Sequence, residues 1–165
     1  MTILYLAFIS FFFCKISLVD YIEHNIYDRD IFISLIIILS YNLQSGTIIT
    51  CLTGLAFGIT AGLLQFFLGY LMYRTEAYGM GDVFLLAVIG AFLGSTIFID
   101  YFMFIQLLLG AILVIVLLMK PSWKRKAIPL APIYITGMFL FLLANKPTLV
   151  EQLNFCINLF WKISS

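Results

Sequence analysis

Two aspartates in an otherwise apolar chain are the residues best suited to chemistry. Asp20 ends one apolar run, and Asp82 stands where a polar loop becomes another apolar run, in the tetrapeptide Gly79-Met80-Gly81-Asp82. Ionisable residues at membrane depth are costly, which makes them functional candidates. Two carboxyl groups that lie close together share one proton, because both cannot ionise cheaply. One can then activate water as a base while the other protonates the leaving group as an acid.

Such a pair hydrolyses a peptide bond without a metal ion, a cofactor or a covalent intermediate, so we expect none of these. Other routes to hydrolysis have little support. The single histidine, His24, belongs to no H-E-x-x-H zinc motif. Ser45-Gly46 lacks the Gly-x-Ser-Gly pattern and the later histidine of an intramembrane serine protease. We interpret His24 as a solvated loop residue, although it could orient Asp20 if the first helix continued that far.

Each position alone also has a structural interpretation. Gly79 and Gly81 could form a turn, because glycine readily adopts φ > 0, and their missing side chains would let an extended peptide lie against the backbone. Asp82 could cap the next helix, which is worth about 1 kcal/mol. Asp20 could simply be solvated at a membrane boundary. The two aspartates taken together are what favour a catalytic interpretation.

The composition indicates an integral membrane protein. Of 165 residues, 64% are hydrophobic and only 10% are charged, whereas soluble domains have about 25% charged residues. Nine basic and eight acidic residues give a net charge of +1, which excludes a basic surface for nucleic acid. No polar linker divides the chain. We therefore predict a single all-α domain over residues 1–165, a polytopic helix bundle in contact with membrane lipid.

A helix that crosses a hydrocarbon core needs roughly 20 apolar residues, and six apolar segments are candidates, of which the second is short. They cover residues 3–19, 31–43, 47–73, 83–99, 101–119 and 128–144. Residues 148–161 are predicted to form an interfacial helix after the last span. Asp100 falls in the tight turn expected between the fourth and fifth spans. Gly54, Gly58 and Gly62 recur every four residues, a pattern that lets another helix approach closely.

Basic residues in short loops stay on the cytoplasmic side of a membrane. With six spans, seven basic residues fall on one side: Lys15, Arg29, Arg74, Lys120, Lys124, Arg125 and Lys126. Only Lys146 and Lys162 fall on the other. We therefore expect Asp20 and Asp82 at the cytoplasmic face, with both chain termini on the opposite side.

Three segments resemble one known family, the type IV prepilin peptidases, which are aspartic proteases of the GxGD class. Residues 76–94 read E-A-Y-G-M-G-D-V-F-L-L-A-V-I-G-A-F-L-G, similar to the family block E-x-M-G-x-G-D-x-K-L-L-A-x-x-G-x-x-x-G. Residues 19–28 resemble a family segment in which I-D precedes L-L-P-D and the first aspartate is catalytic. Residues 128–132 resemble P-F-G-P. The resemblance extends over nearly the whole chain up to Ala144.

The resemblance implies an activity and a place in the cell. The family removes short basic leader peptides from prepilins and pseudopilins of type IV pili and type II secretion, next to a glycine. It does so at the cytoplasmic face of the bacterial inner membrane. By resemblance Asp20 and Asp82 are the catalytic pair, and Gly79, Gly81 and Glu76 belong to the loop that supports substrate binding.

Further acidic residues follow the first span. Glu23, Asp28 and Asp30 could attract a basic leader, which is our own hypothesis rather than a family property. The chain also departs from the family pattern. Tyr27 replaces a proline and Phe84 replaces a lysine, which removes a cation near the second aspartate. Ala131 replaces the glycine of P-F-G-P, and no segment with paired C-x-x-C motifs is present, so we expect no N-methylation by this chain.

Two alternatives from other classes stay open. A small proton-coupled transporter would use the two aspartates as relay carboxylates, and it would show proton-dependent flux without cleavage. A catalytically inactive assembly factor would bind prepilin leaders and leave them intact. The sequence carries no signal for an oligomeric state.

Overall fold

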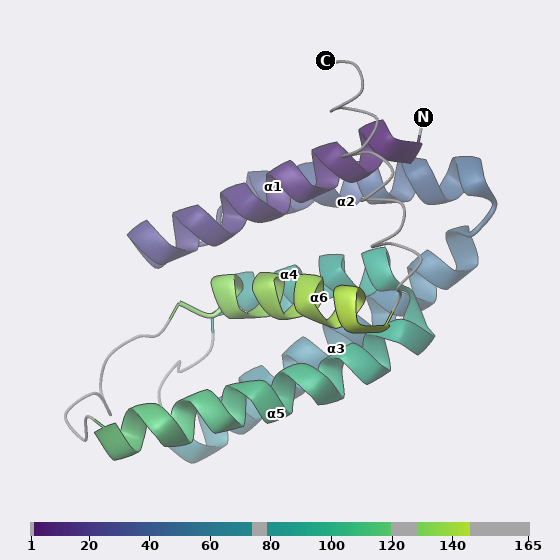
Figure 1. The fold of residues 1–165 in the computed structure, drawn as a ribbon. Coiled ribbons are helices and arrows are strands. Elements are labelled where there is room, and N and C mark those ends of the chain that lie inside the picture. The colour runs from purple at the N-terminus through teal and green to yellow at the C-terminus, as the bar shows by residue number, and fades with distance from the viewer. Residues whose placement is uncertain (1, 74–78, 120–128, 146–165) are drawn as a thin grey trace.

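The computed structural model describes residues 2–73, 79–119 and 129–145. Within these ranges the chain forms only helices and no strands (Figure 1). The helices are α1 (Thr2–Glu23), α2 (Asp28–Ser45), α3 (Ile48–Tyr73), α4 (Met80–Leu93), α5 (Ser95–Met119) and α6 (Ala131–Asn145). An apolar chain adopts helices because lipid offers no hydrogen-bond partners, and a helix satisfies its backbone internally. The predicted all-α membrane helix bundle is confirmed.

Successive helices run back and forth, so α1, α3 and α5 end where α2, α4 and α6 begin (Figure 1). We call this end of the bundle the site end. Asp20 lies on the last turn of α1, three residues before its end at Glu23, and Asp82 lies on the first turn of α4. The alternation of helix direction therefore brings both aspartates to the same end.

The face of α1 that meets the bundle carries one of these aspartates. Ile9, Phe13, Ile16 and Asp20 are all buried and are spaced by four, three and four residues, which is one stripe of a helix. Asp20 thus continues an apolar stripe toward the protein interior. The first predicted span ended at residue 19, whereas the helix continues to Glu23. Asp20 is therefore part of the helix, on the same face as the buried apolar residues.

Helix α4 is the central helix, with nine of its 14 residues buried. The glycine stripe of α3 lies directly against it. A Cβ on Gly58 would lie 2.7 Å from the Cα of Ala87, and one on Gly62 would lie 2.8 Å from the Cα of Val83. Gly54 approaches Gly90 of α4 in the same way. The predicted close approach of another helix to this stripe is confirmed, and the partner is α4.

A matched pair of glycine substitutions tests this contact. Gly58→Ala is expected to lower the free energy of unfolding in detergent by about 1–3 kcal/mol, the usual cost of overpacking. Gly110→Ala on α5 is the control, because a Cβ there meets no heavy atom within 4 Å. Thermal unfolding of both variants should show a drop in Tm for Gly58→Ala alone. Equal Tm values would contradict a backbone contact at Gly58.

Among the residues that the structure describes, three helices are long and apolar enough to cross a membrane, by length and composition: Leu4–Glu23, Ile48–Leu71 and Ser95–Ile112. Helices α4 and α6 are apolar but have only 14 and 15 residues, roughly 21 and 23 Å at 1.5 Å per residue. Helix α2 has 18 residues and begins with three charged ones. Six full spans therefore stay a prediction, and the interfacial helix at 148–161 lies outside the described residues.

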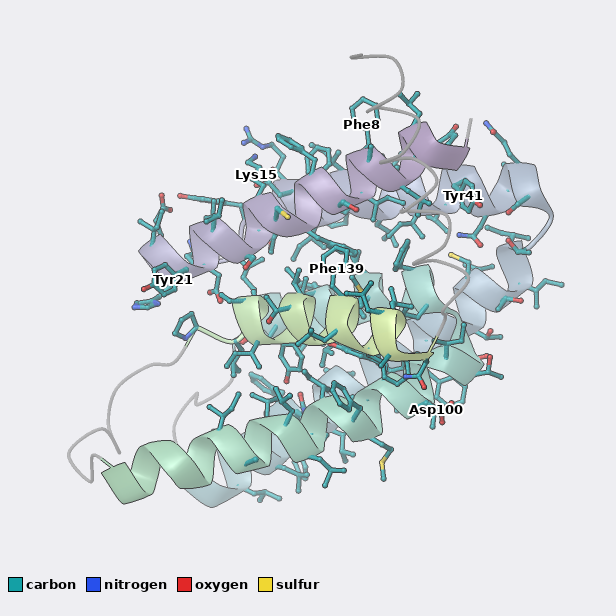
Figure 2. All side chains as sticks on the ribbon, in the orientation of Figure 1. Phe8, Lys15, Tyr21, Tyr41, Asp100 and Phe139 are labelled. Atoms are coloured by element: carbon teal, nitrogen blue, oxygen red, sulfur yellow. The ribbon has the colours of Figure 1, made fainter. Side chains whose placement is uncertain are left out.

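The turn between α4 and α5 differs from the expectation. The sequence predicted a break at Asp100, but α4 ends at Leu93 and α5 begins at Ser95. Gly94 makes the turn alone, with φ of 76°, and its N–H donates to the carbonyl of Gly90. A positive φ is accessible to glycine, whereas the apolar residues around it favour continued helix. Asp100 is therefore an exposed residue of α5, at the end of the bundle opposite Tyr21 (Figure 2).

Candidate active site

A polar cavity of about 390 Å³ opens at the site end of the bundle. Its lining comes from four places: Asp20 on α1, the connection that follows α1, Asp28 at the start of α2, and the segment from Gly79 to Asp82. Asp20 and Asp82 are 62 positions apart in the sequence, yet both line this cavity. The structure therefore brings together the two residues that the sequence singled out.

Asp20 is held by the start of α6. Its side chain is buried, with the residue 6% exposed, and its Oδ2 accepts a hydrogen bond of 3.0 Å from the backbone N–H of Ala131. That N–H is the first of α6, where helical donors have no partner within the helix. Pro132 follows and has no N–H to offer. The positive end of the α6 dipole therefore also faces the Asp20 carboxyl group.

Asp82 is the third residue of α4, after the N-cap Gly79. Its N–H donates to the Gly79 carbonyl at 3.1 Å, and its Oδ2 accepts from the Gly79 N–H at 3.3 Å. Asp82 thus does cap α4, as the structural interpretation proposed. It also faces the cavity that contains Asp20, so the capping role and a chemical role are compatible.

The charge state of Asp82 is perturbed. Asp82 precedes the apolar segment of α4 that starts at Val83, and burial followed by the nearby Asp20 carboxylate raises its pKa to about 6. The hydrogen bond from Gly79 acts in the opposite direction and is the smaller effect. Two carboxyl groups that perturb each other titrate as a pair, in which one proton is retained longer than for an isolated aspartate.

The two glycines, Gly79 and Gly81, lie at the start of α4, and Gly81 allows another segment to pack closely there. Gly79 is extended, with φ of −79°, and Gly81 is the second residue of α4. Neither uses the positive φ that the sequence analysis considered, because the helix starts directly after Gly79. A Cβ on Gly81 would lie 3.0 Å from the Cβ of Ile26. The missing side chain therefore lets the connection after α1 rest on the start of α4, which closes one wall of the cavity.

Other predicted site residues have different placements. Asp28 is exposed and lines the cavity. Glu23 does not line it, and its carboxylate accepts a hydrogen bond of 2.6 Å from the Tyr27 hydroxyl. Glu76 lies outside the described residues. His24 is exposed and borders the cavity, but α1 ends at Glu23 and His24 has φ of 52°, so the helix does not continue through it as orientation of Asp20 would have required.

Asp30 does not belong to an acidic surface, and this part of the hypothesis was wrong. Asp30 is 2% exposed and its Oδ1 lies 2.7 Å from the Nζ of Lys15 on α1. Its place on α2 is one turn before the buried Ser34, on the stripe that faces α1. Residues two positions apart on a helix lie on different faces, so Asp30 is buried against α1 while Asp28 lines the cavity.

Sequence reasoning missed two partners at this site. The Ala131 backbone N–H had no predicted role, although a proline such as Pro132 is typical of the first turn of a helix. Lys15 was counted only among the basic residues of the cytoplasmic side, although a lone charge within an apolar span requires a counter-charge. In the described parts of the chain, no three His, Cys, Asp or Glu side chains are grouped as a metal site would need.

The sequence was also compared with known proteins. A sequence model of the type IV leader peptidase family matches residues 6–118, which include Asp20 and Asp82. The chain belongs to the type IV leader peptidase family. No curated protein and no solved structure matches it significantly. The predicted resemblance is thereby confirmed, and this membrane leader peptidase has prepilins as its implied class of substrate.

The raised pKa of Asp82 predicts a pH-dependent stability for the leader peptidase. The folded pKa of about 6 lies above the ordinary 3.8, so the stability that Asp82 contributes is full at low pH and is lost as the pH rises through about 6. Asp82→Asn removes this ionisation and should raise the stability at pH 7.5 by on the order of 1–3 kcal/mol, with no gain near pH 4. Thermal unfolding of both proteins from pH 4 to 8 measures it. A gain that is independent of pH would contradict the assignment.

Proposed function

We propose that this leader peptidase is an aspartic endopeptidase in which Asp20 and Asp82 form the catalytic acid/base pair. The cavity that both carboxyl groups line is the observation that carries the proposal. The pair holds one proton at the working pH, and the ionised carboxylate takes a proton from water as the water attacks the peptide carbonyl carbon. The other carboxyl group donates its proton toward the carbonyl oxygen.

The intermediate then breaks down at the carbon–nitrogen bond. The proton taken from water passes to the departing amine, the other carboxylate takes back a proton from a hydroxyl group of the intermediate, and the carbonyl re-forms as the new carboxyl group. Each cleavage consumes one water molecule and returns the pair to its starting charge. The bond from Ala131 N–H to Asp20 and the bond from Gly79 N–H to Asp82 hold the two carboxyl groups in place during this cycle.

The proposed substrate is a prepilin or pseudopilin, cut after its basic leader next to a glycine, at the cytoplasmic face of the bacterial inner membrane. The proposed orientation rests on the six-span topology predicted from the sequence, in which seven basic residues fall on the side of Asp20 and Asp82, against two on the other. In a prepilin that is cleaved at this face, the leader lies in the cytoplasm and the apolar segment that follows lies in the membrane. The cavity opens at the end of the bundle that such a substrate would reach.

Cleavage by the purified chain in nanodiscs tests the proposal. The substrate is a synthetic peptide with a basic leader, a glycine and an apolar segment, followed by mass spectrometry. We expect two products whose masses sum to that of the substrate plus one water. An intact peptide that binds the chain would favour the inactive assembly factor, and an intact peptide with proton-dependent flux in liposomes would favour the transporter.

Asp28 gives a separate prediction about the leader. It is exposed at the cavity, so its carboxylate should attract a basic leader through a screened surface charge. Asp28→Asn is expected to raise KM several-fold at low ionic strength with little change in kcat. The difference should vanish in high salt. An equal effect at low and high salt, or the same effect from Asp100→Asn, would contradict attraction of the leader by Asp28.

A further inference from the structure

A second cavity adjoins the first and has a different character. It measures about 180 Å³ and lies among α2, α3 and α4. Asp28 lines both cavities, so they share a wall at the start of α2. Apart from Asp28, every lining residue is apolar. A polar cavity lined by the two carboxyl groups therefore neighbours an apolar one, with Asp28 between them.

The direction of the apolar cavity follows from the helices that line it. Helices α2 and α4 both start at the site end, and the apolar cavity uses Leu35 on α2 and Val88 on α4. At 1.5 Å per residue these positions lie roughly 9–11 Å along the helices from Asp28 and Asp82. The second cavity therefore lies farther from the site end than the two carboxyl groups, and the exposed Phe32 and Phe84 are among its lining residues.

We propose that this apolar cavity is a substrate subsite, which binds an aliphatic or aromatic side chain on the carboxyl side of the cleaved bond. The inference rests on the proposed peptidase function. A substrate that enters from the site end and continues into the membrane passes the carboxyl groups first and the apolar cavity next. An extended chain advances about 3.3 Å per residue, so the side chain comes from the first three residues after the cut.

Size and chemistry agree with this occupant. An apolar cavity of about 150 Å³ accommodates a benzene-sized group, and this one has about 180 Å³. Phe84 contributes an aromatic ring at the position where the family pattern has lysine, and it lines the apolar cavity. A lysine ammonium group at this position would lose hydration against an apolar side chain, and the phenylalanine avoids that cost. The departure at Phe84 is therefore consistent with selection for an apolar side chain here.

Leu55 on α3 is the best position for a test, because it lines the apolar cavity from the helix opposite α2. Leu55→Trp fills the cavity and Leu55→Ala enlarges it. The control is Leu52→Trp, which lies three residues earlier on α3, is 51% exposed and does not line the cavity. Substrates carry Ala, Leu, Phe or Trp at each of the first three positions after the cleaved bond.

The measured quantity is the ratio of kcat/KM for a large side chain to kcat/KM for Ala. At one of the first three positions after the cleaved bond, wild type should have a kcat/KM for Leu or Phe that is roughly 10-fold or more above that for Ala. This is the usual size of discrimination by an apolar pocket. Leu55→Trp should reduce this ratio about 10-fold, and Leu55→Ala should raise the ratio for Trp. Leu52→Trp should leave both ratios unchanged.

Several results would overturn the subsite. Wild type that cleaves all side chains equally would show that the cavity holds lipid or nothing during catalysis. A fall in kcat/KM for every substrate by the same factor in Leu55→Trp would mean a structural role only. Wild type that cleaves none of the peptides overturns the peptidase proposal itself, so the two failures are distinguishable.

Discussion

Asp82→Asn and Asp20→Asn are each expected to reduce kcat/KM for leader cleavage by at least about 1000-fold, because acid/base catalysis contributes 10²–10⁴-fold and each carboxyl group serves in both steps. An asparagine keeps the size of the side chain and its capacity to accept a hydrogen bond. The bonds from Gly79 and Ala131 can therefore persist. The measurement is the initial rate of product formation by mass spectrometry with the purified variants.

The matched control is Asp100→Asn, which removes one carboxylate from an exposed position of α5 at the other end of the bundle (Figure 2). Its rate should equal that of wild type. The double variant Asp20→Asn with Asp82→Asn should be no slower than either single one, since residues that act as one unit are not additive. Additive losses would contradict a shared proton between the two aspartates.

Lys15→Met is expected to destabilise the protein more than any other substitution outside the site. It leaves the Asp30 carboxylate buried without its closest counter-charge, and breaking a buried pair costs about 3–5 kcal/mol. Lys15 is 35% exposed, and Arg29 Nε lies 3.8 Å from the same Asp30 oxygen. We therefore expect a loss of about 3 kcal/mol, at the lower end of that range. Chemical unfolding in detergent micelles measures it.

A double variant separates the pair from ordinary packing. Lys15→Met with Asp30→Leu replaces both charges by apolar groups, which is often neutral or stabilising for a buried pair. The double variant should recover most of the stability lost by Lys15→Met. A double variant that is less stable than Lys15→Met alone would contradict the claim that the lost ion pair causes the destabilisation.

Helical periodicity explains how much of the fold the sequence predicted. The apolar runs predicted the helices, and the four-residue spacing of Gly54, Gly58 and Gly62 predicted the close approach of another helix, which the structure identifies as α4. Alternating helix directions then required Asp20 and Asp82 to share one end. These features depend on residue type and spacing within a segment, which a single sequence displays directly.

Contacts between segments were predicted less well. The ion pair of Lys15 with Asp30 depends on the rotation of α1 against α2, and a single sequence fixes that rotation only through the buried stripes of both helices. The bond from Ala131 N–H to Asp20 spans 111 positions and involves a backbone group, which leaves no mark on residue type. The break at Gly94 was missed because apolar residues on both sides concealed a one-residue turn.

The most direct test of the central claim is the intact mass of a prepilin-type substrate from the same genome, co-expressed with the Asp82→Asn chain and, in parallel, with wild type and Asp100→Asn. Asp82 lines the polar cavity together with Asp20. The account predicts that wild type and Asp100→Asn remove the leader beside a glycine, while the substrate keeps its full mass with Asp82→Asn. Removal of the leader by the Asp82→Asn chain, at wild-type expression, would contradict the account.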